Sequence, residues 1–201
     1  MIRALVLAAG ASSRMGQPKA ALPLGTTGQT VLSVGVQTLL DAGLPSVTVV
    51  GGAHLERTRA LLPRDSRVRF IENAEWERGQ LTSLVAGLEA IGDPQLEAVL
   101  VTLVDVPLVK PSTVRAVIEA WRATRAPIVR PVDGDRHGHP VVFDRSVFEE
   151  LRNADVTVGA KAVFAAHRSA IIDVQVADSG AFEDLDTPED YERLKRYLQT
   201  G

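Results

Sequence analysis

Two positively charged side chains stand among small residues near the start of the chain. Arg14 and Lys19 lie in GASSRMGQPK, residues 10–19, which directly follows the apolar run LVLAA at residues 5–9. Backbone N–H groups of such a loop can point at anionic oxygens, a guanidinium binds two oxygens at once, and an ammonium adds a point charge. This combination is typical of a polyphosphate site, although a strand-to-helix turn with two solvated cations would have the same composition.

The spacing of this loop excludes two common phosphate-binding motifs. No Gly-Lys-Ser/Thr sequence opens a helix, so the loop is not a Walker A loop. Gly10 and Gly16 lie too far apart for the G-x-G-x-x-G dinucleotide fingerprint, and Pro18 interrupts the run of amides.

An aspartate follows the most apolar strand expected in the chain. In VLVTLVDVP, residues 99–107, Asp105 directly follows the apolar run, and Pro107 prevents a central strand from continuing. A carboxylate at the carboxyl end of a buried strand is well placed to bind a hard cation. The alternative is that Asp105 caps the next helix, but Ser112 is expected to be that cap. The sequence therefore favours metal binding by Asp105.

Three other segments carry polar residues whose roles the residues alone leave open. Gly79, Gln80, Thr82 and Ser83 in ENAEWERGQLTSL, residues 72–84, could bind a nucleotide or merely cap a helix, and the pattern alone favours capping. Asp184 and Asp186 in FEDLDTPEDY, residues 182–191, alternate on an extended piece and are expected to face opposite ways. His137 and His139 in RPVDGDRHGHPVVF, residues 130–143, are expected to line a pocket, because a structural zinc site would need cysteines. His54 belongs to no motif, Trp76 lies within ENAEWERGQLTSL, and both are expected to be surface or packing residues.

Apolar runs alternate with amphipathic stretches along the chain. This alternation predicts βαβ units, a mostly parallel sheet covered on both faces, and one domain over residues 1–201. Strands are expected at residues 4–8, 46–50, 68–71, 98–104, 128–130, 140–143 and 170–176. Helices are expected at residues 30–42, 55–61, 81–91, 111–123, 147–151, 159–167 and 186–198. For the last of these, Thr187 is expected to be the cap and Pro188 to occupy the first helical position.

Composition limits the classes of partner. The net charge of −3 argues against a general nucleic-acid binder or a membrane-surface binder. The absence of cysteine excludes disulfides and thiolate chemistry, and it suits a reducing cytoplasm. No stretch is apolar over the roughly 20 residues that a membrane helix needs. A cytoplasmic protein is expected.

The segment LAAGASSRMGQPKAALPL, residues 7–24, resembles the signature of a nucleotidyltransferase superfamily that joins sugar phosphates, isoprenoid precursors or molybdopterin to a nucleotide. The resemblance implies an α/β fold of three layers, Rossmann-like and mostly parallel, with a smaller β portion facing the second substrate. It also implies the residues that hold the nucleoside triphosphate: Leu7, Ala8, Ala9, Gly10, Ala11, Ser12, Ser13, Arg14, Lys19, Gly79, Gln80, Thr82 and Ser83.

Two further matches extend the resemblance to the metal and the acceptor. Asp105 occupies the family's metal position, and the Asp-Thr-Pro match makes Asp186 the second ligand of Mg²⁺ or Mn²⁺, with Asp184 as its substitute. Arg14, Lys19 and Asp105 are then the catalytic residues. The Gly-His-Pro segment resembles that of the molybdenum cofactor cytidylyltransferase branch. This implies an acceptor site made by Arg130, Gly138, His139 and Pro140.

The resemblance implies transfer of CMP from CTP to a phosphate of molybdopterin, with release of pyrophosphate. Ala9 favours CTP over GTP, because relatives that use guanine usually carry a glycine there and a methyl group leaves less room for a purine. A molybdenum-dependent dehydrogenase is a possible recipient of the product. The alternatives are GTP as donor, a sugar phosphate or methylerythritol phosphate as acceptor, a nucleotide-binding protein that delivers the cofactor, and a nicotinamide-dependent oxidoreductase.

Overall fold

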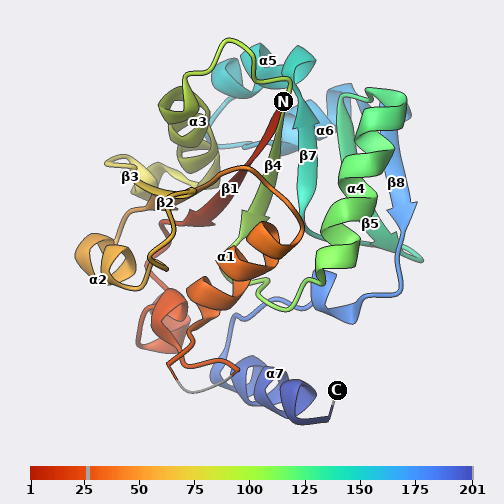
Figure 1. Ribbon diagram of the computed structural model, residues 1–201. Helices are drawn as coiled ribbons and strands as arrows, with labels where there is room; N and C mark the ends of the chain where they lie inside the picture. The colour runs from red at the N-terminus through yellow and green to blue at the C-terminus, as the bar shows by residue number, and fades with distance from the viewer. Residues whose placement is uncertain (26–27, 201) are drawn as a thin grey trace.

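The protein is built around one mixed sheet of eight strands. The computed structural model describes residues 1–25 and 28–200. The strand order is β3-β2-β1-β4-β7-β5-β6, with β8 pairing to β5 (Figure 1). The strands are β1 (Ile2–Ala8), β2 (Val47–Gly51), β3 (Val68–Glu72), β4 (Ala98–Leu103), β5 (Ile128–Asp133), β6 (Arg136–His137), β7 (Val141–Asp144) and β8 (Ile171–Gln175).

The parallel half of the sheet contains the four strands that the sequence marks most strongly. β3, β2, β1 and β4 all run in parallel, whereas β7 is antiparallel to both β4 and β5. β5 is parallel to β8 and forms a short hairpin with β6, which the sequence did not predict. Two residues are too short a strand to leave a periodic pattern in a sequence.

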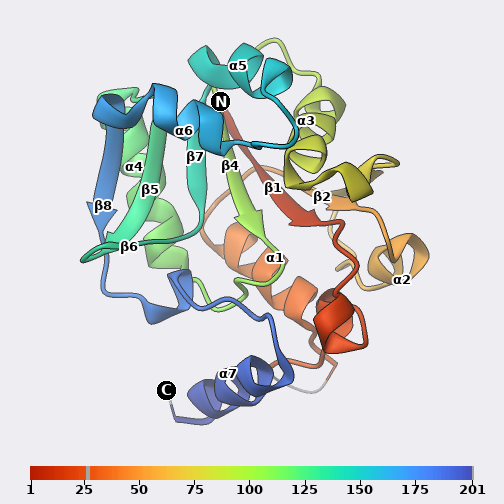
Figure 2. The same ribbon diagram turned by 180° about the vertical axis from the view of Figure 1, so that it is seen from behind.

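Helices cover both faces of this sheet, as the alternating pattern predicted. α1 and α4 lie on one face, and α3, α5 and α6 lie on the other (Figures 1 and 2). The helices are α1 (Val31–Asp41), α2 (Leu55–Ala60), α3 (Gln80–Ile91), α4 (Pro111–Thr124), α5 (Phe148–Asn153), α6 (Lys161–Ala166) and α7 (Pro188–Thr200).

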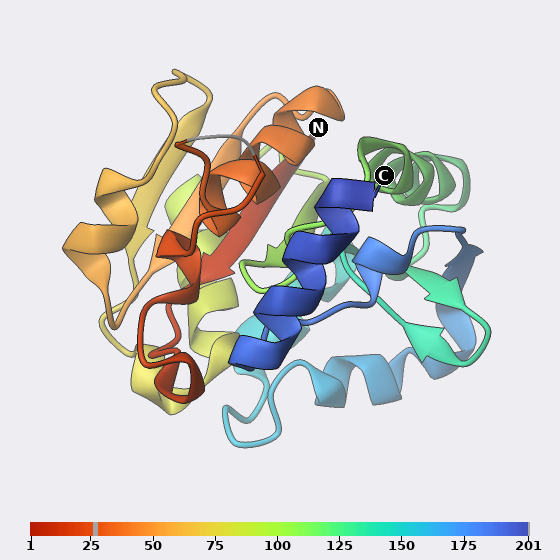
Figure 3. The same cartoon turned by 90° about the horizontal axis from the view of Figure 1, so that it is seen from below.

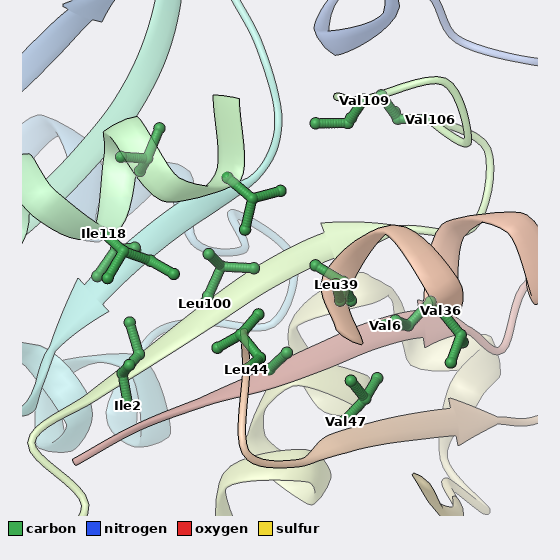
Figure 4. Packing of buried hydrophobic residues seen from close by; sticks show 14 of the residues in the cluster. Ile2, Val6, Val36, Leu39, Leu44, Val47, Leu100, Val106, Val109 and Ile118 are labelled. Atoms are coloured by element: carbon green, nitrogen blue, oxygen red, sulfur yellow. The ribbon is translucent and has the colours of Figure 1, made fainter. Parts of the chain in front are cut away.

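Alternate residues of the central strands enter two separate cores. Ala4 and Val6 of β1 pack with α1 and α4, whereas Leu5 and Leu7 pack with α3. All four side chains are buried, which explains why β1 reads as a continuous apolar run. Figure 4 shows part of the first core, with Val6 beside residues of α1.

The last helix, α7, crosses the carboxyl end of the sheet in the view from below (Figure 3). Its start matches the sequence prediction, because Thr187 Oγ1 accepts the N–H of Asp190 and the Asp190 carboxylate accepts the N–H of Thr187. Pro188 is the first helical residue. A third apolar cluster, which includes Leu22, Leu185 and Leu194, attaches α7 to the segment after the glycine loop.

The predicted cap of α4 is wrong. Ser112 lies inside α4, and Lys110 is the residue that precedes the helix. The carboxylate of Asp178, 68 residues away from Lys110 along the chain, accepts the Lys110 N–H at 2.9 Å and the Thr113 hydroxyl at 2.6 Å. A local pattern cannot reveal a cap that comes from so distant a residue.

Candidate active site

The glycine loop and Asp105 meet because β1 and β4 are parallel neighbours. Leu7 of β1 pairs with Leu103 of β4, so the segments that follow both strands leave the same edge of the sheet. The chain proceeds from β1 to β2 and β3 on one side and then places β4 on the other side of β1. Such a switch point is where open α/β sheets bind ligands, outside the carboxyl ends of the strands.

A cavity of about 370 Å³ opens at this switch point. We call it the first cavity. Most of the residues predicted to bind the nucleotide line it, and so does Asp105. The predicted residues in the lining are Leu7, Ala8, Ala9, Gly10, Ser12, Ser13, Arg14, Lys19, Gly79, Gln80, Ser83 and Asp105.

The glycine loop has a defined shape in this structure. Ser12 and Gly16 have positive φ angles of 53° and 65°, on either side of a short 3₁₀ turn at Ser13–Met15. The hydroxyl of Ser12 accepts the Lys19 N–H at 3.1 Å, which joins the two ends of the loop. Arg14 is thereby held at the rim, where its side chain is 68% exposed.

Lys19 connects both predicted metal ligands. Its Nζ atom lies 3.1 Å from Asp105 Oδ2 and 2.6 Å from Asp186 Oδ1, and the Lys19 side chain is only 12% exposed. Arg14 Nη2 lies 3.1 Å from the other oxygen of Asp186. The structure therefore brings together Arg14, Lys19, Asp105 and Asp186, which span 172 positions of the sequence.

The pKa values of Lys19 and Asp186, which form the shortest of these ion pairs, are both shifted from their ordinary values. Partial burial lowers the pKa of Lys19, but the hydrogen bonds and charges of Asp186 and Asp105 outweigh burial and raise it above its ordinary value. The hydrogen bond from Lys19 lowers the pKa of Asp186 below its ordinary value. Lys19 is charged and Asp186 ionised at neutral pH.

The carboxylate pair fits a hard divalent cation. Asp105 Oδ1 is buried and has no hydrogen-bond partner, and a single cationic atom, Lys19 Nζ, already contacts both Asp105 and Asp186. Oxygen donors of this kind suit Mg²⁺ and Mn²⁺. Within residues 1–25 and 28–200 there is no cluster of three or more side chains of the His, Cys, Asp or Glu type that could hold a metal, so further ligands would come from phosphate oxygens or water.

Asp184 occupies a different position from Asp186. Loss of solvent around its carboxylate, followed by the charges of Asp105 and Asp186, raises the pKa of Asp184 above its ordinary value. Asp186 is the acid that contacts Lys19 and Arg14, as the Asp-Thr-Pro match implied.

Two residues predicted to bind the nucleotide lie outside the lining of the first cavity. Thr82 faces the other side of α3, where its hydroxyl accepts from Asn73 Nδ2 at 2.8 Å and donates to the Gly79 carbonyl at 2.8 Å. Ala11 is held by its carbonyl oxygen, which lies 2.9 Å from His54 Nε2. These bonds join the first turn of α3 to the segment before it, but the hydroxyl of Thr82 accepts no helix N–H, so the alternative that Thr82 caps α3 is not confirmed.

His54 and Trp76 line the first cavity, so the expectation that they are only surface or packing residues is wrong. His54 precedes α2 and contacts the glycine loop through the Ala11 carbonyl. Trp76 lies beside Gly52, where an added Cβ would approach Trp76 Cβ to 2.7 Å. Trp76 lies within residues 72–84, but the pattern of that segment assigns it no role, and no sequence signal joins residue 54 to residue 11.

A second cavity, of about 390 Å³, adjoins the first. The two share Leu7, Gln80 and Leu103 in their linings. Three residues predicted to bind the acceptor, together with His137, line the second cavity, but Pro140 is buried elsewhere, beside α1 and α4. Those in the lining are Arg130, His137, Gly138 and His139, and the sequence missed Lys161 and Phe164.

The histidine turn is packed tightly against the segment before α7. The N–H of His139 donates to the Ala181 carbonyl at 2.9 Å, and an added Cβ on Gly138 would lie 2.3 Å from the same oxygen. Only glycine fits at Gly138 without a shift of backbone. Burial lowers the pKa of His139, although the charge of Asp105 and the Val101 carbonyl oppose the effect.

Comparison with known proteins agrees with this geometry. Residues 4–171 match the MobA-like NTP transferase domain. The chain is 26% identical to the molybdenum cofactor cytidylyltransferase of Escherichia coli, with 98% of each chain covered. It is 28% identical to the purine catabolism protein PucB of Bacillus subtilis, covering 96% of this chain and 95% of the relative.

Solved structures show the same fold. The structure of Rv0371c from Mycobacterium tuberculosis superposes with a TM-score of 0.82 at 30% identity, covering 98% of both chains. A manganese complex of Rv0371c matches at 30% identity with a TM-score of 0.75, covering 97% of this chain and 98% of that one.

The chain therefore belongs to the MobA-like NTP transferase family. The protein is an enzyme, a nucleotidyltransferase with a Rossmann-like fold. This confirms the superfamily implied by the glycine loop and rejects the nicotinamide-dependent oxidoreductase. Within the described part of the chain, no helix combines the length and the apolar character that crossing a membrane requires.

Proposed function

We propose that this nucleotidyltransferase transfers CMP from CTP to the phosphate of molybdopterin and releases pyrophosphate. The observation that carries the proposal is that the first cavity, which is lined by Lys19 and Asp105, adjoins a second cavity of similar size. One cavity is lined by a polyphosphate-type loop, and the other has largely apolar walls. The full-length similarity to the Escherichia coli cytidylyltransferase supports this choice of substrates.

The reaction needs no covalent enzyme intermediate. An oxygen of the acceptor phosphate attacks the α-phosphorus of CTP in line and forms a new P–O–P link. The bond between the α-phosphorus and the oxygen bridging to the β-phosphorus breaks, and pyrophosphate carries that oxygen away. The work of the protein is to position the two phosphates and to neutralise their charge.

The proposal assigns roles to the polar groups of the glycine loop and of the start of α3, and to the two aspartates. The loop amides from Gly10 to Ser13, with Arg14 and Lys19, bind the triphosphate. Gln80 and Ser83 face the nucleoside from the start of α3. Asp105 and Asp186 would hold a divalent cation, Mg²⁺ or Mn²⁺, which neutralises phosphate charge when it is bound; the manganese complex of Rv0371c supports such a cation.

CTP is preferred to GTP because of Ala9. Its side chain is 6% exposed and lies in the lining of the first cavity, where a methyl group takes space that a purine would need. The proposal extends to a cytoplasmic location, to one domain over residues 1–201, and to a molybdenum-dependent dehydrogenase as recipient of the product.

Pyrophosphate release tests the proposal. The enzyme would be incubated with Mg²⁺ and either CTP or GTP, with and without molybdopterin. We expect release that requires molybdopterin and is faster with CTP. Release with a sugar phosphate or methylerythritol phosphate but not with molybdopterin would overturn the acceptor, and faster release with GTP would overturn the nucleotide. Triphosphate binding without release for any acceptor would favour a protein that delivers the cofactor.

A further inference from the structure

The second cavity has an unusual balance of charge. Its lining contains four basic or imidazole side chains, and no aspartate or glutamate is among the lining residues in the described part of the chain. The chain as a whole carries a net charge of −3. The four side chains are those of Arg130, His137, His139 and Lys161.

Lys161 differs from Arg130 and His139 in having a charge with no counter-ion. Arg130 is neutralised by Asp173, whose Oδ1 lies 2.7 Å from Arg130 Nε. Burial holds the pKa of His139 below its ordinary value and favours the neutral ring. The ion pairs formed within residues 1–25 and 28–200 include none from Lys161, which is exposed as the first residue of α6.

The loop before Lys161 is ordered by its own hydrogen bonds. Asp155 Oδ1 accepts the N–H of Thr157 at 2.8 Å and its hydroxyl at 2.7 Å, and the Asp155 carbonyl accepts the N–H groups of Val158 and Gly159. This loop therefore holds the start of α6 in place.

The same loop presents an apolar side chain to solvent. Val158 is 49% exposed, yet it lies in the lining of the second cavity. Phe164 lines the cavity as well, and its ring meets that of Phe143 edge to face, with centroids 5.6 Å apart. An apolar residue with such exposure beside an uncompensated cation suits a ligand that has both an anionic group and an apolar ring system.

We propose that Lys161 is a specificity-determining residue that binds the phosphate of the acceptor, and that Val158 and Phe164 contact the ring system of the same molecule. The ligand class is a phosphate monoester of a flat ring compound. This inference rests on the proposed function, because it takes the second cavity to be the acceptor site.

Calorimetric titration with 1-naphthyl phosphate tests the inference without the transfer reaction. The first cavity would be filled with Mg²⁺ and an α,β-methylene analogue of CTP, so that no transfer occurs. We expect Lys161→Gln to bind 1-naphthyl phosphate about tenfold more weakly than wild type, in line with the loss of one charge-assisted hydrogen bond. Lys161→Arg should keep most of the affinity, and raising the salt concentration should weaken wild type more than Lys161→Gln.

The controls separate Lys161 from general effects of charge and folding. Lys110→Gln removes an exposed lysine that lies in neither cavity lining and should bind like wild type. 1-Naphthol, which has the ring but not the phosphate, should bind wild type and Lys161→Gln equally. Affinity for the CTP analogue should be the same in all variants.

The outcomes distinguish this inference from the proposed function. Equal affinity of wild type and Lys161→Gln, or no binding of 1-naphthyl phosphate by wild type, would overturn the role of Lys161 even if molybdopterin is the acceptor. Weaker binding by Lys161→Gln would support that role even if pyrophosphate release showed that the natural acceptor is a different phosphate.

Discussion

The lysines of the two cavities differ in whether they are paired with a carboxylate. In the first cavity Lys19 is paired with Asp105 and Asp186, and Arg14 is paired with Asp186. In the second cavity Lys161 stands without a carboxylate among the lining residues that the structure describes. A triphosphate and a cation must therefore rearrange existing ion pairs, whereas an anionic acceptor meets a charge that is already free.

The cavities also differ in what builds them. A single loop, residues 7–19, supplies much of the first cavity, mostly through backbone and small side chains. The second is lined by side chains from β4, β5, β7, α3 and the segment leading into α6. Substitutions in the first should mainly alter the reaction, and substitutions in the second should mainly alter the choice and affinity of the acceptor.

The largest effect is expected from Asp105→Asn. Asparagine has the same shape but no charge, so the pair with Asp186 loses its affinity for a hard cation. Pyrophosphate release should fall by about a thousandfold, and Mn²⁺ binding followed by electron paramagnetic resonance should weaken. Affinity of the second cavity for 1-naphthyl phosphate should not change.

The control is Asp65→Asn. Asp65 is paired with Arg67 and lies outside both linings, so this variant should behave as wild type. Full turnover by Asp105→Asn would show that the reaction does not need the charge of Asp105 in the first cavity.

Lys19→Met should separate two functions of one cation. Loss of a phosphate contact should slow turnover by about a hundredfold. Without nucleotide, however, the variant should bind Mn²⁺ more tightly than wild type, because Lys19 contacts both carboxylates in the free enzyme. Electron paramagnetic resonance titration of the two proteins measures the difference. Unchanged or weaker Mn²⁺ binding would show that Lys19 does not compete with the metal.

Gly138→Ala should lower the stability of the folded protein. The new Cβ would lie 2.3 Å from the Ala181 carbonyl oxygen and 2.7 Å from the ring of Phe182, so the backbone has to shift. We expect the free energy of unfolding in urea to fall by about 1–3 kcal/mol. Gly35→Ala is the matched control, because it lies inside α1 with nothing within 4 Å of the added methyl group. The control should be slightly more stable than wild type. A loss of stability in both variants would contradict the packing described for the histidine turn.

The smallest effect concerns His139 and pH. Because its pKa is below the ordinary value of 6.5 in the folded state, the unfolded chain binds a proton between these two pKa values and the folded chain does not. The free energy of unfolding should therefore rise with pH in that interval and fall on acidification. His139→Gln should remove this part of the slope, and NMR titration of the ring should give a midpoint below 6.5. A midpoint above that value would show that the Asp105 charge outweighs burial.

The features of the fold and the site that the sequence predicts are those encoded in contiguous residues. The loop at residues 7–19, the buried strand before Asp105 and the start of α7 each carry a local pattern, and the structure has all three in the expected places. The parallel order of β1 to β4 follows from the alternation of apolar runs and amphipathic helices.

Contacts between distant residues could not be predicted from these patterns. The ion pair of Lys19 with Asp186 joins residues 167 positions apart, and the cap of α4 by Asp178 replaces the local candidate Ser112. Lys161 and His54 enter the cavities only through the packing of α6 and α2 on the sheet, for which the sequence has no local signal.

On the proposed function, a nucleotide is joined to an acceptor phosphate where the two cavities meet. The most direct test is to incubate the enzyme with molybdopterin, Mg²⁺ and CTP radiolabelled at either the α- or the γ-phosphate, and to separate the products. We expect the α-label to enter a molybdopterin–cytidine dinucleotide and the γ-label to appear only in pyrophosphate, and we expect Asp105→Asn to lose both results. Release of the α-label as free CMP, or its retention in CTP while pyrophosphate is absent, would contradict the proposed function.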